Sequence, residues 1–226
     1  MEITTLQAWL EKAKEAAIAA GEKILEVYSS ESFGEEIKKD KSPLTLADKL
    51  AHQAIVARLQ SSEWPILSEE GKSIAYAERK DWPLFWMVDP LDGTKEFIKR
   101  NGEFTVNIAL IEKGRSIMGV VYVPVSGKMY VALKGKGAFT GEGMATDKPL
   151  HAAQYTKADK GLKVVGSRSH MNPETEQFMA QFDSPEVVSM GSSLKFMLVA
   201  EGSAHVYPRI APTMEWDTAA AQIVVE

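Results

Sequence analysis

The sequence predicts a layered α/β or α+β fold, and three observations lead to this prediction. Segments with the apolar spacing of helices are mixed with short apolar runs typical of strands, and such mixtures build layered folds. Hydrophobic residues make up 45% of the 226 residues, which is enough for one large core. The chain shows no internal repeat, low-complexity stretch or long linker. We therefore expect residues 1–226 to form one unit with a soft internal boundary near residues 140–160.

Two helices are predicted at the start of the chain. Apolar residues follow helical spacing from Leu6 to about Tyr28. After a polar loop, a second helix is expected to begin near Thr45, because Asp48 stands three residues on, as in a capping box. The buried face of this second helix is expected to include Leu46.

Strands are predicted to follow these helices. The segment "WPILSEEG" predicts a short buried strand that ends on acids, and the apolar run Leu84–Val88 predicts a second strand that ends at Asp89. The segments "GEFTVNIALIEKG" and "SIMGVVYVPVSGKMYVALKGKGAF" predict further strands separated by glycine-bearing turns. These strands are expected to form a meander.

The second half predicts strands and single helices in alternation. A strand is expected in "LKVVGSRSH", a helix in "NPETEQFMAQF", and a strand, a glycine turn and a helix in "VVSMGSSLKFMLVAEG". The segment "SAHVYPRI" predicts a strand and "MEWDTAAAQIVVE" a last helix. That helix would run to Glu226 with no cap, so we expect the C-terminal end to be truncated.

Composition limits the classes of partner and chemistry. A net charge of −5 argues against a nucleic-acid polymer as partner, because neutralising phosphates requires clustered Lys and Arg. The absence of cysteine excludes disulfides and thiolate nucleophiles and is typical of a reducing compartment. The segment "MEITTLQAWLEKAKEAAIAAGEK" matches neither a signal peptide nor a membrane span. We expect a cytoplasmic protein without a transmembrane segment; peripheral attachment to the inner membrane and the choice between monomer and homodimer stay open.

The segment "FWMVDPLDGTKEFI" delivers two carboxylates at the end of a buried strand. Asp89 and Asp92 flank Pro90, which fixes its own φ and favours an extended backbone in the preceding residue. Such a stiff turn can direct both carboxylates and the Leu91 carbonyl towards one point. Mg²⁺ prefers oxygen ligands of this kind and commonly shares them with a substrate phosphate. A plain surface turn is the alternative, because D-x-x-D pairs also arise by chance.

The next residues suit a phosphate. Gly93 permits close approach of the backbone, and Thr94 with Lys95 predicts the start of a short helix whose free N–H groups can bind an anion. The motif therefore combines the parts of a metal site with those of a phosphate site.

Further acids stand at comparable places along the chain. Glu69 and Glu70 follow "WPIL", and Asp217 lies at the start of the final helix, where the helix dipole alone would favour an acid. With the D-x-x-D pair, one of these two glutamates and Asp217 would supply four acids for about two or three Mg²⁺ ions.

Other catalytic motifs are absent from the sequence. There is no G-x-x-x-x-G-K-[ST] phosphate loop, and the histidines show no H-x-x-x-H spacing. Phosphatases that form an aspartyl-phosphate need D-x-D-x-[TV], and the spacing here is one residue longer. The metal-dependent interpretation has no rival of equal strength.

The segment "DPLDGTKEF", preceded by "ILSEE" and followed far downstream by "WDTAAA", resembles the inositol monophosphatase superfamily of Mg²⁺-dependent, lithium-sensitive phosphatases. Within it, the chain is most similar to the bacterial 3'(2'),5'-bisphosphate nucleotidases of the CysQ type. The resemblance covers nearly the whole chain, including "NGEFTVNIALI", "GVVYVPV" and "GSSLKFMLVAEG". It implies a layered αβαβα sandwich with a metal-site half first and a nucleotide-side half after the soft boundary.

The family pattern implies roles for positions of this sequence. Glu69, rather than Glu70, is implied as the first metal carboxylate, and Thr94 with Glu69 is implied to orient and deprotonate the attacking water. Asp48 matches an acid near an outer metal. The implied metal ligands are the carboxylates of Glu69, Asp89, Asp92 and Asp217 and the carbonyl of Leu91. The implied catalytic residues are Glu69, Asp89 and Thr94. The residues implied to border the substrate are Leu91, Asp92, Gly93, Thr94 and Asp217.

A second set of residues is expected to hold the rest of the substrate. Ser192 and Lys195 stand at the start of the helix in "GSSLKFMLVAEG", where a lysine is better explained by an anionic ligand than by helix stability. Arg209 is a second candidate cation, although arginine is common at exposed strand ends. Arg168 and His170 in "GSRSH" are candidates for contact with the nucleotide, with a plain polar loop as an equal alternative.

The resemblance implies hydrolysis of adenosine 3',5'-bisphosphate to AMP and phosphate, with the sulfated nucleotide as a further substrate. Spacing alone supports only a Mg²⁺-dependent phosphomonoesterase. The alternatives are an inositol or sugar phosphatase on the same fold, and a sensor that binds the nucleotide without turnover. The complete set of implied acids argues against the sensor, because a decayed site usually loses a member.

Overall fold

The centre of the molecule is a seven-stranded sheet. The computed structural model describes residues 3–34, 36–37, 43–166 and 173–226. Its strands lie in the order β3-β4-β5-β6-β7-β8-β9, and all neighbours are antiparallel except β3 and β4, which run parallel. The predicted meander is confirmed and extends one strand further. The strands are β3 (Ile66–Ser68), β4 (Leu84–Asp92), β5 (Thr105–Glu112), β6 (Arg115–Val123), β7 (Lys128–Leu133), β8 (Gly137–Glu142) and β9 (Ala145–Pro149).

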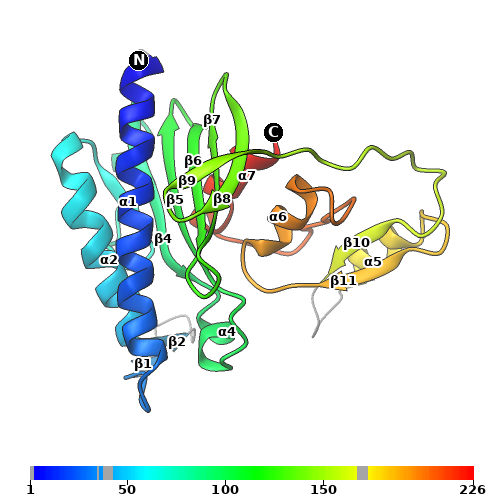
Figure 1. The fold of residues 1–226 in the computed structure, drawn as a ribbon, viewed down its shortest axis with the longest axis horizontal. Coiled ribbons are helices and arrows are strands. Elements are labelled where there is room, and N and C mark those ends of the chain that lie inside the picture. The colour runs from blue at the N-terminus through cyan, green and yellow to red at the C-terminus, as the bar shows by residue number, and fades with distance from the viewer. Residues whose placement is uncertain (1–2, 35, 38–42, 167–172) are drawn as a thin grey trace.

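Helices cover both faces of this sheet (Figure 1). The first two helices, α1 (Ile3–Tyr28) and α2 (Leu46–Leu59), pack on one face, and α7 (Glu215–Val225) with α6 (Leu194–Ala200) packs on the other. Beyond α6 a second, parallel sheet contains β10 (Lys163–Gly166) and β11 (Glu186–Ser189), joined by α5 (Pro173–Met179). The predicted α+β class is confirmed. The remaining elements are α3 (Tyr76–Arg79), α4 (Thr94–Ile98), a 3₁₀ turn (Gln60–Ser62) and the short pair β1 (Glu36–Ile37) and β2 (Pro43–Leu44).

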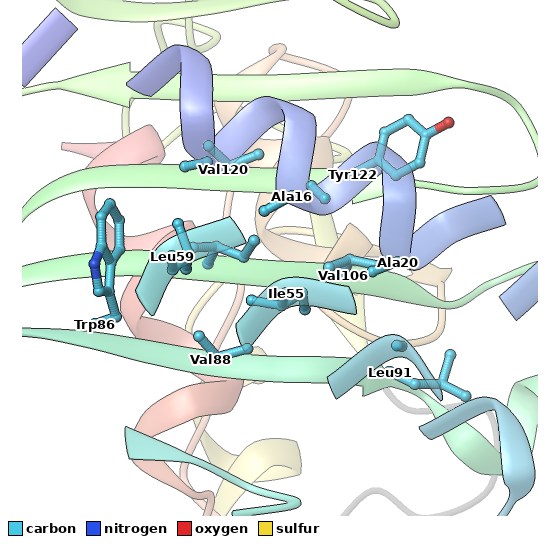
Figure 2. Close-up of a cluster of buried hydrophobic side chains, with 14 of the residues drawn as sticks. Ala16, Ala20, Ile55, Leu59, Trp86, Val88, Leu91, Val106, Val120 and Tyr122 are labelled. Carbon is cyan, nitrogen blue, oxygen red and sulfur yellow. The ribbon is translucent and has the colours of Figure 1, made fainter. Parts of the chain in front are cut away.

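Strand β4 shows how the core directs the first catalytic acid. Trp86 and Val88 belong to the cluster under α1 and α2 (Figure 2), whereas Phe85 and Met87 belong to the cluster under α6 and α7. Because side chains alternate between the two faces of a strand, Asp89 comes next on the α7 side. The buried strand thus carries a carboxylate towards the first turn of α7.

Strand β4 continues past Asp89, contrary to our prediction. Asp89 lies opposite Asn107 of β5, and Asp92 lies opposite Thr105. Three steps along β4 therefore match two steps along β5, which is a β-bulge. A bulge tolerates Pro90 and re-aims the side chains after it, so that Leu91 lies in the core under α1 and α2.

Two smaller predictions are wrong. Leu46 is exposed, because α2 turns the smaller Ala47 and Ala51 towards the core. The segment "SAHVYPRI" forms no strand; it contributes only an isolated bridge between Val206 and Val164 of β10. No helix in the described part of the chain is both long and apolar enough to cross a membrane.

Candidate active site

Three carboxylates meet at the edge where β3, β4 and α7 come together. Oxygen atoms of Glu69, Asp89 and Asp217 all lie within 4.8 Å of one another. Glu69 follows β3 directly, and its backbone N–H donates to the Val88 carbonyl at 3.1 Å, which fixes it beside Asp89. Asp217 lies in the first turn of α7, and its Oδ2 accepts the Met214 N–H at 3.0 Å. The group contains Glu69 and not Glu70, and the role of Glu69 as a metal ligand remains a prediction.

The electrostatics of this group favour a bound cation. Asp89 is only 1% exposed. Burial, followed by the charges of Asp92, Glu69 and Asp217, raises the pKa of Asp89 well above its usual value. Three carboxylates held this closely repel one another, and an all-oxygen set suits a hard divalent cation such as Mg²⁺. The residues present therefore fit the metal that the sequence predicts.

Without metal, the protein is expected to lose stability as the pH rises. A raised pKa means that the folded state binds the Asp89 proton more tightly than the unfolded chain does. The resulting stabilisation is fully present below the ordinary pKa of 3.8 and disappears as the pH rises through the raised value. Thermal melts in chelator over about pH 4 to 8 should show a steeper fall in Tm for the wild type than for Asp89→Asn. Parallel curves for the two proteins would contradict this explanation.

Thr94 is held by a buried acid. Its hydroxyl, in the first turn of α4, donates to Asp48 Oδ1 at 3.2 Å and lies 3.4 Å from the Leu91 carbonyl. The other Asp48 oxygen accepts from the backbone and hydroxyl of Thr45 at 2.7 and 2.6 Å, which forms the predicted capping box. Asp48 thus orients Thr94, and it lies outside the group of three carboxylates.

Asp92 is close to this group without belonging to it. Its Oδ2 accepts hydrogen bonds from the Ser193 N–H at 2.6 Å, the Ser193 hydroxyl at 2.7 Å and the Ser192 hydroxyl at 2.8 Å. One oxygen of Asp92 is therefore committed to the protein. The role of Asp92 as a metal ligand remains a prediction that would use Oδ1.

A cavity of about 390 Å³ opens beside the carboxylates. Most of the residues that the sequence predicts to border the substrate line it. The position of Gly93 favours glycine, because its φ of 95° is left-handed and an added Cβ would lie only 3.1 Å from the Glu103 carbonyl oxygen. The predicted lining residues are Asp92, Gly93, Ser192, Lys195, Arg209 and Asp217; those not predicted are Lys95, Glu96, Ser193, Phe196, Tyr207, Thr213 and Thr218.

Lys195 and Arg209 bring positive charge to the cavity. The Lys195 ammonium donates to the Ser192 carbonyl at 3.0 Å and lies 6.0 Å from the centre of the Tyr207 ring. Burial lowers the pKa of Lys195, and the carboxylates of Asp92 and Glu96 oppose that effect. Arg209 is exposed and donates to the Pro212 carbonyl at 2.9 Å.

The residues Arg168 and His170 lie outside the part of the chain that the structure describes. Their contact with a nucleotide stays a prediction. Tyr207 and Phe196, whose ring centres are 4.9 Å apart, were not predicted as lining residues. The only signal in the sequence was their closeness to Arg209 and Lys195.

Comparison with known proteins finds similarity to the inositol monophosphatase family in both sequence and structure. The model of the inositol monophosphatase family matches residues 5–226. The chain is 46% identical to the 3'(2'),5'-bisphosphate nucleotidase CysQ of Salmonella typhimurium over 218 residues, which is 95% of this chain and 86% of that protein. The crystal structure of CysQ from Bacteroides thetaiotaomicron matches with a TM-score of 0.82 and 46% identity, over 96% of this chain and 85% of that one. Inositol monophosphatase from Anabaena matches with a TM-score of 0.75 and 25% identity, over 98% and 81%.

Proposed function

The chain belongs to the inositol monophosphatase family, and on this premise we propose that it is a 3'(2'),5'-bisphosphate nucleotidase. It hydrolyses adenosine 3',5'-bisphosphate to AMP and phosphate, and the sulfated nucleotide is a further substrate. The observation that carries this proposal is the cavity itself. It joins the three-carboxylate group, through Asp217, to the cations Lys195 and Arg209 in one space.

The metal-binding role falls to Glu69, Asp89 and Asp217, with Asp92 Oδ1 and the Leu91 carbonyl as further ligands. About two or three Mg²⁺ ions would be held there and would neutralise the charge that develops on the phosphoryl group. A bound cation would remove the repulsion between these carboxylates. This explains why Asp89, whose pKa is raised by burial and by its neighbours, lies beside other acids.

The residues around Thr94 orient the attacking water. Because the Thr94 proton is directed to Asp48, the free lone pairs of the Thr94 hydroxyl can accept a hydrogen bond from a water. Glu69 takes the water proton as general base. The water oxygen then bonds to phosphorus, the bond from phosphorus to the ribose oxygen breaks, and that oxygen takes a proton from solvent.

The second phosphate of the substrate is held by Lys195 and Arg209. An ammonium that is half-buried in a cavity binds an anion more strongly than an exposed one, because less water screens the pair. Asp92 precedes the expected boundary at residues 140–160 and Lys195 follows it, yet both residues line the same cavity. We therefore also propose that residues 1–226 act as one phosphatase unit.

Phosphate release tests this function. With Mg²⁺, adenosine 3',5'-bisphosphate should be hydrolysed with a kcat/KM at least about tenfold above that for inositol 1-phosphate, and lithium should inhibit. Preference for inositol 1-phosphate would keep the metal site and overturn the roles of Lys195 and Arg209. Binding of the nucleotide without release of phosphate would favour a sensor.

Removing the Thr94 hydroxyl is expected to slow the chemical step. Thr94→Val should lower kcat by about a hundredfold with little change in KM, because the attacking water loses the hydrogen bond that orients it. Thr94→Ser, which keeps the hydroxyl, should recover most of the activity. Wild-type kcat in Thr94→Val, measured by phosphate release, would exclude this residue from the mechanism.

A further inference from the structure

A buried polar network lies beneath Asp92, and the mechanism above does not use it. Thr105 and Asn107 on β5 are 0% and 1% exposed. Thr105 Oγ1 lies 2.7 Å from Ser192 Oγ, and Asn107 Nδ2 lies 2.8 Å from Ser193 Oγ. Both serines bond to Asp92, so Thr105 reaches this carboxylate through the Ser192 hydroxyl. Asn107 reaches it through the Ser193 hydroxyl and also directly, by a longer contact of 3.4 Å from Nδ2 to Asp92 Oδ2.

The direction of these hydrogen bonds follows from counting protons. An ionised carboxylate only accepts, and each hydroxyl has a single proton to donate. Ser192 therefore donates to Asp92 Oδ2, so that Thr105 must be the donor to Ser192. The single Thr105 proton is shared with Asn107 Oδ1, an acceptor to which Thr105 also donates at 3.2 Å, the longer of its two contacts.

The second chain of hydrogen bonds runs in the same direction. Ser193 donates to Asp92 Oδ2 at 2.7 Å, a shorter contact than its 3.0 Å to the Asp217 carbonyl. Asn107 Nδ2 donates to the Ser193 oxygen at 2.8 Å and, at the longer distance of 3.4 Å, to Asp92 Oδ2 itself. Both chains thus converge on one oxygen, and hydrogen bonds that run in one direction polarise and strengthen each other.

Backbone geometry supports a role in positioning. Ser192 has φ 54°, in the left-handed region that residues other than glycine seldom adopt. Such a conformation persists where the surroundings hold it in place, and here both partners of its hydroxyl do so. Thr105 also lies directly opposite Asp92 across the β-bulge.

We propose that Thr105 and Asn107 are positioning residues for the reaction. Through Ser192 and Ser193, and through the direct contact of Asn107, they fix Asp92 Oδ2 against the protein, so that Oδ1 is presented to the cavity in one orientation. The kinetic part of this inference rests on the proposed function, whereas its metal-binding part does not.

The test compares two isosteric changes in the same sheet. Thr105→Val removes the donor to Ser192, and Thr140→Val removes a buried hydroxyl that bonds to the Met129 carbonyl at 2.9 Å, away from the site. Both should lower Tm slightly. Thr105→Val alone should raise the Mg²⁺ concentration for half-maximal Tm shift about tenfold and lower kcat about tenfold, and Thr105→Ser should restore both.

A second background shows whether the effect passes through Asp92. In Asp92→Asn, Thr105→Val should cause no further change in the half-saturating Mg²⁺ concentration. A Thr105→Val protein that matches Thr140→Val in Mg²⁺ response, or a full additional effect in Asp92→Asn, would overturn the proposal. If the wild type releases no phosphate, the proposed function fails and the Mg²⁺ response still decides this inference. Should Thr105→Val not fold, the Mg²⁺ response of Asn107→Ala is compared with that of Thr140→Val, and equal responses would overturn the proposal.

Discussion

Asp89→Asn is expected to lower kcat by about a thousandfold or more while leaving the fold intact. The change keeps the shape of the side chain and an oxygen that can accept the Leu91 N–H, which Asp89 Oδ1 now accepts at 3.1 Å. It removes the charge at the most buried member of the three-carboxylate group. Loss of a metal contact that stabilises the transition state by several kcal/mol corresponds to such a rate loss. Phosphate release and circular dichroism measure the two effects.

Metal-free stability provides an internal check on this result. Because burial and neighbouring acids disfavour the charged form of Asp89, the neutral amide should give an equal or higher Tm in chelator near neutral pH. Asp147→Asn, the same change at an exposed position of β9, should alter neither activity nor Tm. Activity of Asp89→Asn near the wild-type level would remove Asp89 from the metal site.

Lys195→Met is expected to raise KM for adenosine 3',5'-bisphosphate by about ten- to a hundredfold. Methionine keeps an unbranched chain against Tyr207, so packing is largely retained while the charge is lost. A charge-assisted hydrogen bond contributes about 1.5–3 kcal/mol, which is the size of the expected loss. Initial rates over a range of nucleotide concentrations give KM and kcat separately.

The same variant should discriminate between substrates. For a simple ester such as p-nitrophenyl phosphate, which has no second phosphate, KM should change by less than about threefold. Lys148→Met, at an exposed position of β9, serves as the matched control and should change neither KM. Equal increases for the nucleotide and the simple ester would refute a role of Lys195 in specificity.

The features that sequence could predict depend on neighbouring residues. The capping box of α2 needs only Thr45 and Asp48, which stand three residues apart. Likewise, an apolar strand followed by acids specifies that Asp89 ends up at the edge of a core. The position of Glu69 beside Asp89 follows once β3 and β4 pair in parallel.

The features that escaped prediction depend on distant partners. Strand β4 continues past Pro90 only because β5 accommodates a bulge there, and β5 lies beyond the helix α4. The commitment of Asp92 Oδ2 depends on Ser192, which is 100 residues further along the chain. The prediction that Leu46 is buried was wrong for a related reason, since the close packing of α2 on α1 selects small residues such as Ala47 for the interface.

Anomalous diffraction from crystals soaked in Mn²⁺ and phosphate tests the central claim most directly. We predict a strong peak about 2.1 Å from carboxylate oxygens of Glu69, Asp89 and Asp217, with phosphate bound to it on the side of the cavity. A further peak beside Asp92 Oδ1 would show that this oxygen is also a metal ligand, as proposed. A protein that is active with Mn²⁺ but shows its peaks away from these three carboxylates would contradict the account.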